Sequence, residues 1–261
     1  MSSAAGVGAA TALLEVDGLV RHFGGVQAVA DASSVVKPGT ITGLIGPNGA
    51  GKSTVIDMIS GRTRADRGAV RFEGRDITDH RAHQVSQRGI IRTFQTANVF
   101  GRLTVVENLL MGATAWHGER LSRALWRRSC WSATEAELVE RAFSLLQRFS
   151  LEKLANEYAG SLSGGQKRLV EVMRALMAEP KMLLLDEPMA GVNPTLALSI
   201  AERLIELRDQ GMTMLMVEHE LRWVDKLCDP VVVMARGRVL AEGSMEELHE
   251  NQQVVDAYLG G

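Results

Sequence analysis

The chain has 261 residues, of which 46% are hydrophobic and 23% charged, as in ordinary globular proteins and unlike disordered ones. Its formal net charge of −2 gives no global basic field of the kind that favours nucleic-acid binding, so we expect no nucleic-acid partner. The two cysteines, Cys130 and Cys228, belong to no paired motif and indicate reduced thiols in the cytosol, not a disulfide framework.

Residues 1–12 are rich in Ser, Ala and Gly and lack the basic start of a secretory signal, so we expect a loose leader there. No apolar run approaches the roughly 18–20 residues that cross a bilayer, so another chain would have to supply any membrane span. Apolar runs predict peripheral antiparallel strands at 14–17, 26–29 and 35–36. The run Ile41–Ile45 predicts a strand that leads into a glycine-rich loop.

This loop, Gly-Pro-Asn-Gly-Ala-Gly-Lys-Ser at 46–53, fits the pattern G-x-x-x-x-G-K-[ST], and a helix is expected from Lys52 to Gly61. Glycines let backbone N–H groups wrap an anion, and the helix adds the positive end of its dipole. We therefore expect Lys52 to bind the β- and γ-phosphates of a nucleotide and Ser53 to ligate Mg²⁺. The nucleotide-binding residues expected here are Gly46, Pro47, Asn48, Gly49, Ala50, Gly51, Lys52, Ser53 and Thr54.

A hairpin strand at 70–72 is expected to end in a Glu-Gly turn, and from about 104 to 178 the pattern becomes helical. Within this part, Ser163 can cap a helix with Gln166 as its reciprocal partner. The two glycines between them leave the helix start bare. The motif therefore indicates either a second phosphate site or simply a well-capped helix.

The run Met182–Leu185 predicts a strand buried on both faces, as in a parallel sheet, and it ends in two carboxylates. Asp186 is expected to bind Mg²⁺ through water, and Glu187 to polarise the attacking water. The two side chains leave an extended strand in different directions, so they can take separate roles.

Asn193, followed by proline, is expected to cap a helix that ends at Gly211. Two more buried strands are expected at 212–217 and 231–234, and a capping box at Ser244 begins a last helix. Strands that alternate with helices in this way predict a mostly parallel α/β sheet.

In company with the phosphate loop and the acidic strand end, the stretch 162–166, Leu-Ser-Gly-Gly-Gln, resembles the signature motif of ABC ATPases, and the resemblance runs from about Leu13 to Gly260. It implies a P-loop NTPase (RecA-like) α/β core with a peripheral antiparallel β-subdomain and an inserted helical subdomain. In that family the signature helix reaches the γ-phosphate of ATP held by the other subunit. The resemblance therefore implies a head-to-tail dimer, with Ser163, Gly164, Gly165 and Gln166 binding the partner's ATP.

The same resemblance assigns the domains and the remaining site residues. The nucleotide-binding domain would span 13–261, divided into a core lobe at about 13–95 and 171–240, a helical subdomain at about 96–170, and a C-terminal hairpin and helix at about 236–261. Gln95 would approach Mg²⁺ and water and couple to the membrane subunit, and His219 would contact the γ-phosphate. Phe23 would stack on adenine, or simply pack. The catalytic candidates are thus Glu187, His219 and Gln95, and the metal-binding candidates are Ser53, Gln95 and Asp186.

One stretch departs from the family pattern. The D-loop of that family usually reads Ala-Leu-Asp or similar, whereas this chain has Ala-Gly-Val-Asn-Pro at 190–194. Asn193 lacks the charge of aspartate but keeps the capping role, so the dimer contact is expected in altered form.

Several stretches, at 23–26, 90–95, 104–109, 190–194 and 257–260, resemble the ATPase subunits of branched-chain or hydrophobic amino-acid importers. The resemblance implies two transmembrane permeases, a second ATPase (homologous or a second copy), an external solute-binding protein, and a peripheral position on the cytoplasmic face of a prokaryotic inner membrane. Urea and amide importers resemble the chain as well. A soluble ABC ATPase of translation or repair is disfavoured. Such proteins usually have two of these domains or a long coiled-coil insert, and this sequence shows neither. A non-catalytic regulatory subunit is disfavoured by the intact catalytic residues.

One segment of the expected helical lobe mixes tryptophan with arginine. This composition suits contact with a membrane surface or a permease, but it is also that of an exposed helix in the helical lobe. The residues are Trp116, Arg120, Arg123, Trp126, Arg127, Arg128 and Trp131.

Overall fold

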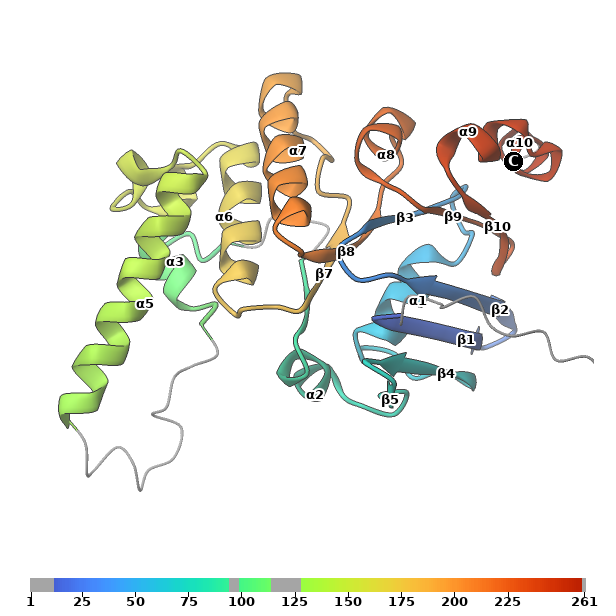
Figure 1. Ribbon diagram of the computed structural model, residues 1–261, viewed down its shortest axis with the longest axis horizontal. Helices are drawn as coiled ribbons and strands as arrows, with labels where there is room; N and C mark the ends of the chain where they lie inside the picture. The colour runs from blue at the N-terminus through green and yellow to red at the C-terminus, as the bar shows by residue number, and fades with distance from the viewer. Residues whose placement is uncertain (1–11, 94–98, 114–127, 260–261) are drawn as a thin grey trace, which may run out of the picture.

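The computed structural model (Figure 1) describes residues 12–93, 99–113 and 128–259, with the backbone alone for 128–134 and 258–259. The expected leader therefore lies outside the described residues except for its last position. Gln95 and the side chains of the tryptophan- and arginine-rich segment also lie outside them.

A mixed ten-stranded sheet runs through the described part of the chain. Its strands are β1 Leu14–Phe23, β2 Val26–Val36, β3 Ile41–Ile45, β4 Arg67–Phe72, β5 Arg75–Asp76, β6 Ile90–Arg92, β7 Met182–Asp186, β8 Thr213–Val217, β9 Val231–Ala235 and β10 Arg238–Gly243. They lie in the order β5-β4-β1-β2-β10-β9-β3-β8-β7-β6. The run β9-β3-β8-β7-β6 is parallel, and β5-β4-β1-β2 is antiparallel. The expected parallel sheet and the peripheral antiparallel strands are thus confirmed.

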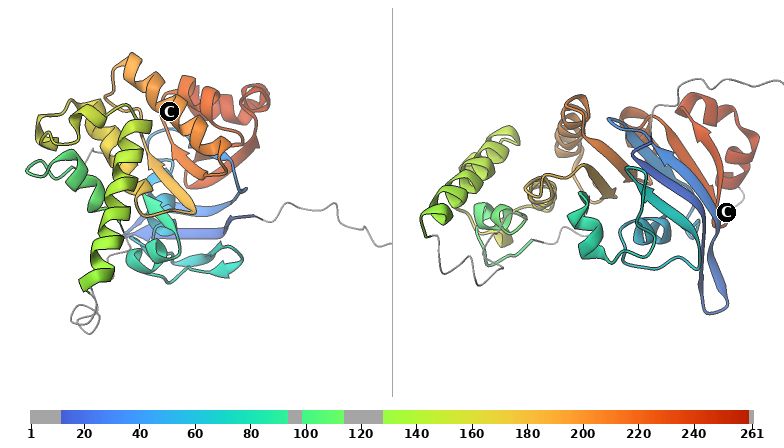
Figure 2. Two further views of the ribbon diagram at one scale, coloured as in Figure 1. Left: turned by 60° about the vertical axis from the view of Figure 1, so that its left-hand side comes forward. Right: turned by 60° about the horizontal axis from the view of Figure 1, so that its bottom comes forward.

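The described helices are α1 Lys52–Ile59, α2 Ala82–Gln87, α3 Val105–Leu110, α5 Arg128–Arg148, α6 Gly164–Leu176, α7 Pro194–Asp209, α8 Leu221–Leu227, α9 Met245–Glu250 and α10 Gln252–Leu259, with 3₁₀ turns at Glu152–Leu154 and Ala159–Ser161. Helices α6, α7 and α8 cover one face of the parallel strands, and α1 lies on the other face with the antiparallel strands (Figure 1). Helix α5 stands farthest from the sheet, beyond α6 (Figure 2).

Strand β7 shows why the molecule has two cores. Leu183 and Leu185 pack into a cluster with α3, α5, α6, α7 and α8, whereas Met182 and Leu184 pack into a second cluster with α1 and the antiparallel strands. All four side chains are fully buried, because successive residues of a strand face opposite sides of the sheet. An unbroken apolar run therefore supplies both cores.

The chain before α3 is held by one buried amide. The Asn108 side chain accepts a hydrogen bond from the N–H of Phe100 (2.8 Å) and donates to the carbonyls of Phe100 (3.1 Å) and Thr104 (2.8 Å). Thr104 caps α3 in a reciprocal box with Glu107. These bonds fix the start of α3 beside α6.

Some expected elements differ in the structure. The strands expected at 26–29 and 35–36 are one continuous strand, β2, because its weak Ala- and Ser-rich middle pairs along β1. The single last helix is two, since Asn251 interrupts it and accepts a hydrogen bond from the N–H of Gln253 (3.0 Å). Elements α2, β6 and α8 were not predicted, and each is short.

Candidate functional site

The phosphate loop joins the buried strand β3 to helix α1. Gly46 has φ +148°, and a Cβ there would lie 2.0 Å from the carbonyl oxygen of Met234, so only glycine fits. The helix is capped by Gly51, so its N-cap residue has no side chain to bond the first N–H groups. A helix start without a side-chain cap keeps its N–H donors for an anion.

Lys52 lies inside the loop to which it belongs. Its side chain is 5% exposed, and Nζ donates to the carbonyls of Gly46 (2.7 Å) and Pro47 (3.0 Å). Burial lowers the pKa of Lys52, and the negative charge of Glu187 opposes that shift. An ammonium group desolvated in this way is stabilised by any anion that approaches the loop.

The other phosphate-loop candidates differ in exposure. Asn48, Gly49 and Ser53 are exposed, Pro47, Gly51 and Thr54 are half-buried, and Gly46 and Ala50 are buried. Ser53, which follows the buried Lys52 in the chain, is thus exposed, as a ligand for Mg²⁺ would need to be.

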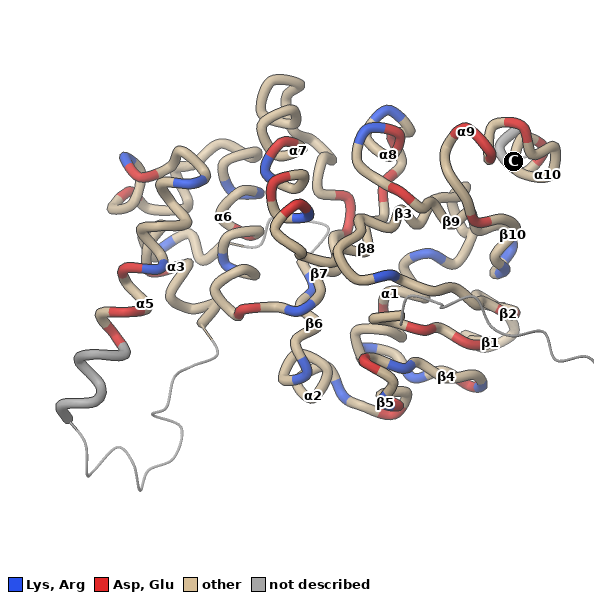
Figure 3. The backbone as a smooth tube through the Cα atoms, viewed as in Figure 1, with Lys and Arg blue, Asp and Glu red and all other residues tan. Residues whose placement is uncertain are grey.

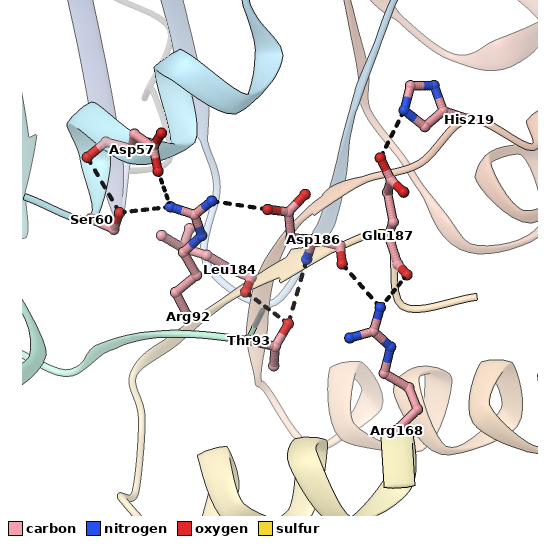
Figure 4. Close-up of polar contacts among 9 residues, drawn as sticks. All are labelled: Asp57, Ser60, Arg92, Thr93, Arg168, Leu184, Asp186, Glu187 and His219. Carbon is pink, nitrogen blue, oxygen red and sulfur yellow. Dashed lines mark hydrogen bonds and ion pairs between the residues drawn. The ribbon is translucent and has the colours of Figure 1, made fainter. Parts of the chain in front are cut away.

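The acidic strand end lies beside the end of β8, because Asp186 pairs with Val217 in parallel register. Asp186 is buried, and its Oδ2 accepts a hydrogen bond from Arg92 Nη2 (2.9 Å; Figure 4). The same guanidinium reaches helix α1, where Nη1 donates to Asp57 Oδ1 and to Ser60 Oγ (3.2 Å). Arg92 therefore bridges β7 and the helix that follows the phosphate loop.

Glu187 and His219 form a pair at this edge. Glu187 Oε1 lies 2.8 Å from His219 Nε2 (Figure 4), with the glutamate side chain 16% and the imidazole 42% exposed. Glu187 has φ +49°, a left-handed conformation that is rare for a residue with a side chain, and its N–H donates to the carbonyl of Val217 (2.9 Å). A backbone kept in such a conformation is typical of a functional position.

A neighbouring residue, Glu218, was not among the expected site residues. Its buried carboxylate accepts hydrogen bonds from the N–H groups of Met189 (2.9 Å) and His219 (3.2 Å). Burial raises the pKa of Glu218, and these two donors lower it in part. The side chain thus connects the turn after Glu187 to the loop that carries His219.

The signature helix α6 begins as expected. Ser163 Oγ accepts from the N–H of Gln166 (3.3 Å), and Gln166 Oε1 accepts from the N–H of Ser163 (2.9 Å). The two glycines differ: a Cβ at Gly164 would meet nothing within 4 Å, whereas one at Gly165 would lie 2.2 Å from Leu196 Cδ2. Gly165 is therefore needed for close packing of α6 against α7.

Arg168 links this helix to the acidic strand end. Its Nη2 donates to the carbonyls of Glu187 (2.7 Å) and Asp186 (3.4 Å; Figure 4), and Nη1 donates to Glu171 Oε2 (2.7 Å). Both Arg168 and Glu171 are buried. The signature helix and the edge that carries Glu187 therefore form one connected unit.

The last two candidates lie apart from these contacts. Phe23, at the end of β1, is 48% exposed, and the Arg21 guanidinium lies 4.8 Å from its ring centroid. Asp66 bonds both Arg21 and the N–H of His22, and the latter bond lowers the pKa of Asp66. Asn193 caps α7 as expected, because its Oδ1 accepts from the N–H of Leu196 (3.0 Å).

The structure therefore brings Lys52, Asp186, Glu187 and His219 to one edge of the sheet and leaves Phe23 on an exposed strand end. Sequence reasoning missed three charged residues: Arg168 and Glu218, which are buried, and Arg92, which is partly buried. One signal was present for Arg168, which precedes Val172 by one helical turn on the apolar stripe of α6. A charge at such a position needs a buried partner.

The structure also bears on the candidate Mg²⁺ ligands and on membrane-spanning helices. In residues 12–93, 99–113 and 128–259, no three His, Cys, Asp or Glu side chains gather as a metal site. Mg²⁺ is usually held by one or two carboxylates together with phosphate oxygens, and Ser53 and Asp186 offer hard oxygen ligands of this kind.

None of the described helices combines the length and the apolar character of a membrane span. Residues of both charge signs are spread over the described chain (Figure 3).

The chain was compared with known proteins. A family model described as ABC transporter matches residues 29–190, more than half of the chain. The chain is 45% identical to a probable branched-chain amino acid transport ATP-binding protein LivG of Archaeoglobus fulgidus, over 95% of both chains. It is 35% identical to the high-affinity branched-chain amino acid transport ATP-binding protein BraF of Pseudomonas aeruginosa, over 95% of this chain and 98% of BraF.

Solved structures of ATP-binding cassettes are similar to this chain as well. The crystal structure of a nucleotide-free ATP-binding cassette from an ABC transporter has a TM-score of 0.83 at 40% identity, covering 96% of this chain and all of that one. The ADP conformation of another such cassette has a TM-score of 0.83 at 41% identity, with the same coverage. The chain therefore belongs to the ABC transporter family as an ATP-binding subunit, an ATPase with the P-loop α/β fold of that family.

Proposed function

We propose that this ATPase drives the uptake of branched-chain or other hydrophobic amino acids through partner permeases. The relatives named for branched-chain amino acid transport support this cargo, since they align along nearly the whole chain. The observation that carries the catalytic part is the Glu187–His219 pair, 2.8 Å apart at the sheet edge where the buried Lys52 lies. An importer of urea, amides or another small solute would use the same machinery.

The geometry supports the roles proposed for the described residues. Lys52 and the N–H groups at the start of α1 bind the β- and γ-phosphates of ATP. The Glu187 carboxylate orients and polarises the attacking water, and His219 holds that carboxylate through Oε1 and contacts the γ-phosphate. Arg168 fixes the backbone at Asp186 and Glu187. Phe23 and Gln95 keep the roles implied by the family: adenine stacking, and contact with Mg²⁺ and water.

Ser53 and Asp186 would hold Mg²⁺, Asp186 through water. When bound, Mg²⁺ neutralises charge that develops on the phosphates. The chemistry then consists mainly of positioning and electrostatics, and each of these residues needs to be fixed before the reaction begins. The buried, hydrogen-bonded carboxylate of Asp186 meets that requirement.

We also propose a head-to-tail dimer in which Ser163, Gly164, Gly165 and Gln166 bind the partner's ATP, with Asn193 near the dimer contact. The second ATPase is homologous or a second copy. Two transmembrane permeases and an external solute-binding protein complete the system, and the chain lies on the cytoplasmic face of the inner membrane. The proposed lobes are the core at about 13–95 and 171–240, the helical subdomain at about 96–170 and the C-terminal part at about 236–261.

The test begins with recovery of the tagged chain from detergent-solubilised native membranes and identification of its partners by mass spectrometry. The expected partners are two permeases and a second ATPase, which are then reconstituted in proteoliposomes with the associated solute-binding protein. ATP-driven uptake of labelled leucine, but not of urea, is expected, and the Glu187→Gln assembly serves as the control without turnover. Uptake of urea alone would refute the amino-acid cargo. Soluble partners alone would refute the transporter.

A further inference from the structure

Arg92 is the last residue of β6, and its side chain reaches two other elements. Its guanidinium joins Asp186, at the end of β7, to Asp57 on α1 and to Ser60, the residue that follows α1 (Figure 4). The Arg92 side chain is 12% exposed and that of Asp186 is 7% exposed. A charge-assisted bond at this burial is screened little by solvent and fixes the orientation of both groups.

The base of the arginine is fixed as well. The N–H of Thr93 donates to the carbonyl of Leu184 (2.9 Å), and the N–H of Asp186 lies 3.4 Å from Thr93 Oγ1 (Figure 4). Strand β6 also pairs with β7 up to Arg92 and Leu184. The guanidinium is therefore held at a set distance from the carboxylate that it contacts.

The contact uses only one of the two oxygens of Asp186. Oδ2 accepts the bond from Arg92, whereas Oδ1 accepts none from any described residue. In Figure 4 the second oxygen points away from the guanidinium. A carboxylate held through one oxygen presents the other in a defined direction.

We propose that Arg92 is a positioning residue for Mg²⁺: it holds Asp186 through Oδ2 so that Oδ1 receives the water shell of the ion. Its second arm, on Asp57, ties that orientation to the helix that begins at the phosphate loop. This inference rests on the proposed metal role of Asp186. Partners that orient metal ligands from outside typically contribute about 10- to 100-fold to metal affinity or activity.

The experiment uses the full chain and a fluorescent, non-hydrolysable ATP analogue, so turnover plays no part. Affinity is measured in EDTA and then across a Mg²⁺ titration for the natural chain, Arg92→Ala, Arg92→Lys, Asp57→Asn and Asp186→Asn. The matched control is Arg75→Ala, which removes an exposed arginine on the edge strand β5. Thermal unfolding of each variant verifies that it is folded.

For Arg92→Ala we expect the half-saturating Mg²⁺ concentration to rise about tenfold, while affinity in EDTA changes less than about twofold. Arg92→Lys is expected to recover part of the loss, because lysine restores the charge but bonds as a single point. Asp57→Asn is expected to shift the titration in the same direction by less, and Arg75→Ala not at all. An arginine with only a structural role would not change the Mg²⁺ titration selectively.

An unchanged titration in Arg92→Ala, or a lower half-saturating Mg²⁺ concentration, would overturn the inference. If that variant does not fold, an unchanged titration in both Arg92→Lys and Asp57→Asn decides against it in the same way. Asp186→Asn distinguishes the two levels of the argument. If Asp186→Asn shifts the titration and Arg92→Ala does not, only the role of Arg92 fails, whereas no shift in Asp186→Asn refutes the metal role of Asp186 itself.

Discussion

Helices α1 and α6 both begin at glycine-rich turns, yet their first turns are built differently. The start of α1 has no side-chain cap, and the loop before it encloses its own lysine. The start of α6 is capped by Ser163 and Gln166, and one of its glycines packs against α7. The first arrangement leaves helix N–H donors for an anion, whereas in the second the Ser163 side chain already accepts from the N–H of Gln166. Variants at the two helix starts, and at the sheet edge between them, test this difference.

The largest expected effect is on turnover. Glu187→Gln should lower the ATPase rate by about a thousandfold, since it removes the carboxylate that polarises water, while nucleotide binding persists. The measurement pairs steady-state phosphate release with size-exclusion chromatography in ATP, where closed dimers should accumulate. Glu220→Gln, a change at an exposed neighbouring glutamate, is the control. Ordinary turnover by Glu187→Gln would remove the proposed role.

The two helix starts can be separated by their lysines. Lys52→Ala should weaken ATP binding by the isolated chain about 100-fold, because it removes charge-assisted bonds of about 3 kcal/mol in total. Lys167→Ala, at the start of α6, should leave that binding unchanged. Equilibrium binding of a fluorescent ATP analogue measures both. Equal losses in the two variants would mean that the α6 start binds nucleotide within the same chain.

The adjacent glycines of α6 provide a matched pair for stability. Gly165→Ala should destabilise the fold by about 1–2 kcal/mol, since Leu196 must move away from the added methyl group. Gly164→Ala adds a methyl group in open space and should leave stability equal or slightly raised. Urea unfolding gives both values. A similar loss in both would show that packing against α7 is not the reason for glycine at 165.

The smallest effect concerns pH. The pKa of Glu218 is raised in the folded chain, so its stabilising contribution is full below its unfolded value of about 4.3 and is lost as pH rises through the folded pKa. Glu218→Gln lacks this titration but loses one acceptor for a backbone N–H. Its melting temperature should therefore lie below that of the natural chain at pH 4.5, and the difference should narrow as the pH rises towards 8. A difference that stays constant over this range would contradict the prediction.

Local patterns predicted the parts of the site that local structure builds. Ser163 and Asn193 cap their helices as expected, because an N-cap depends on residues two or three positions away. The buried run at β7 likewise predicted where Asp186 lies. Arg92 and Glu218 were not predictable in this way. Their partners lie 94 positions away for Arg92 and Asp186, and 29 for Glu218 and Met189, and only the folded sheet brings them together.

The left-handed backbone at Glu187 has a consequence for protein engineering. A residue with a side chain in this conformation costs about 1–2 kcal/mol relative to glycine. Selection of variants for heat resistance alone would therefore favour Glu187→Gly. The selected variants would be expected to have lost ATP hydrolysis. A stability screen on this protein needs a simultaneous selection for turnover. At this position glycine suits the backbone conformation, whereas hydrolysis requires glutamate.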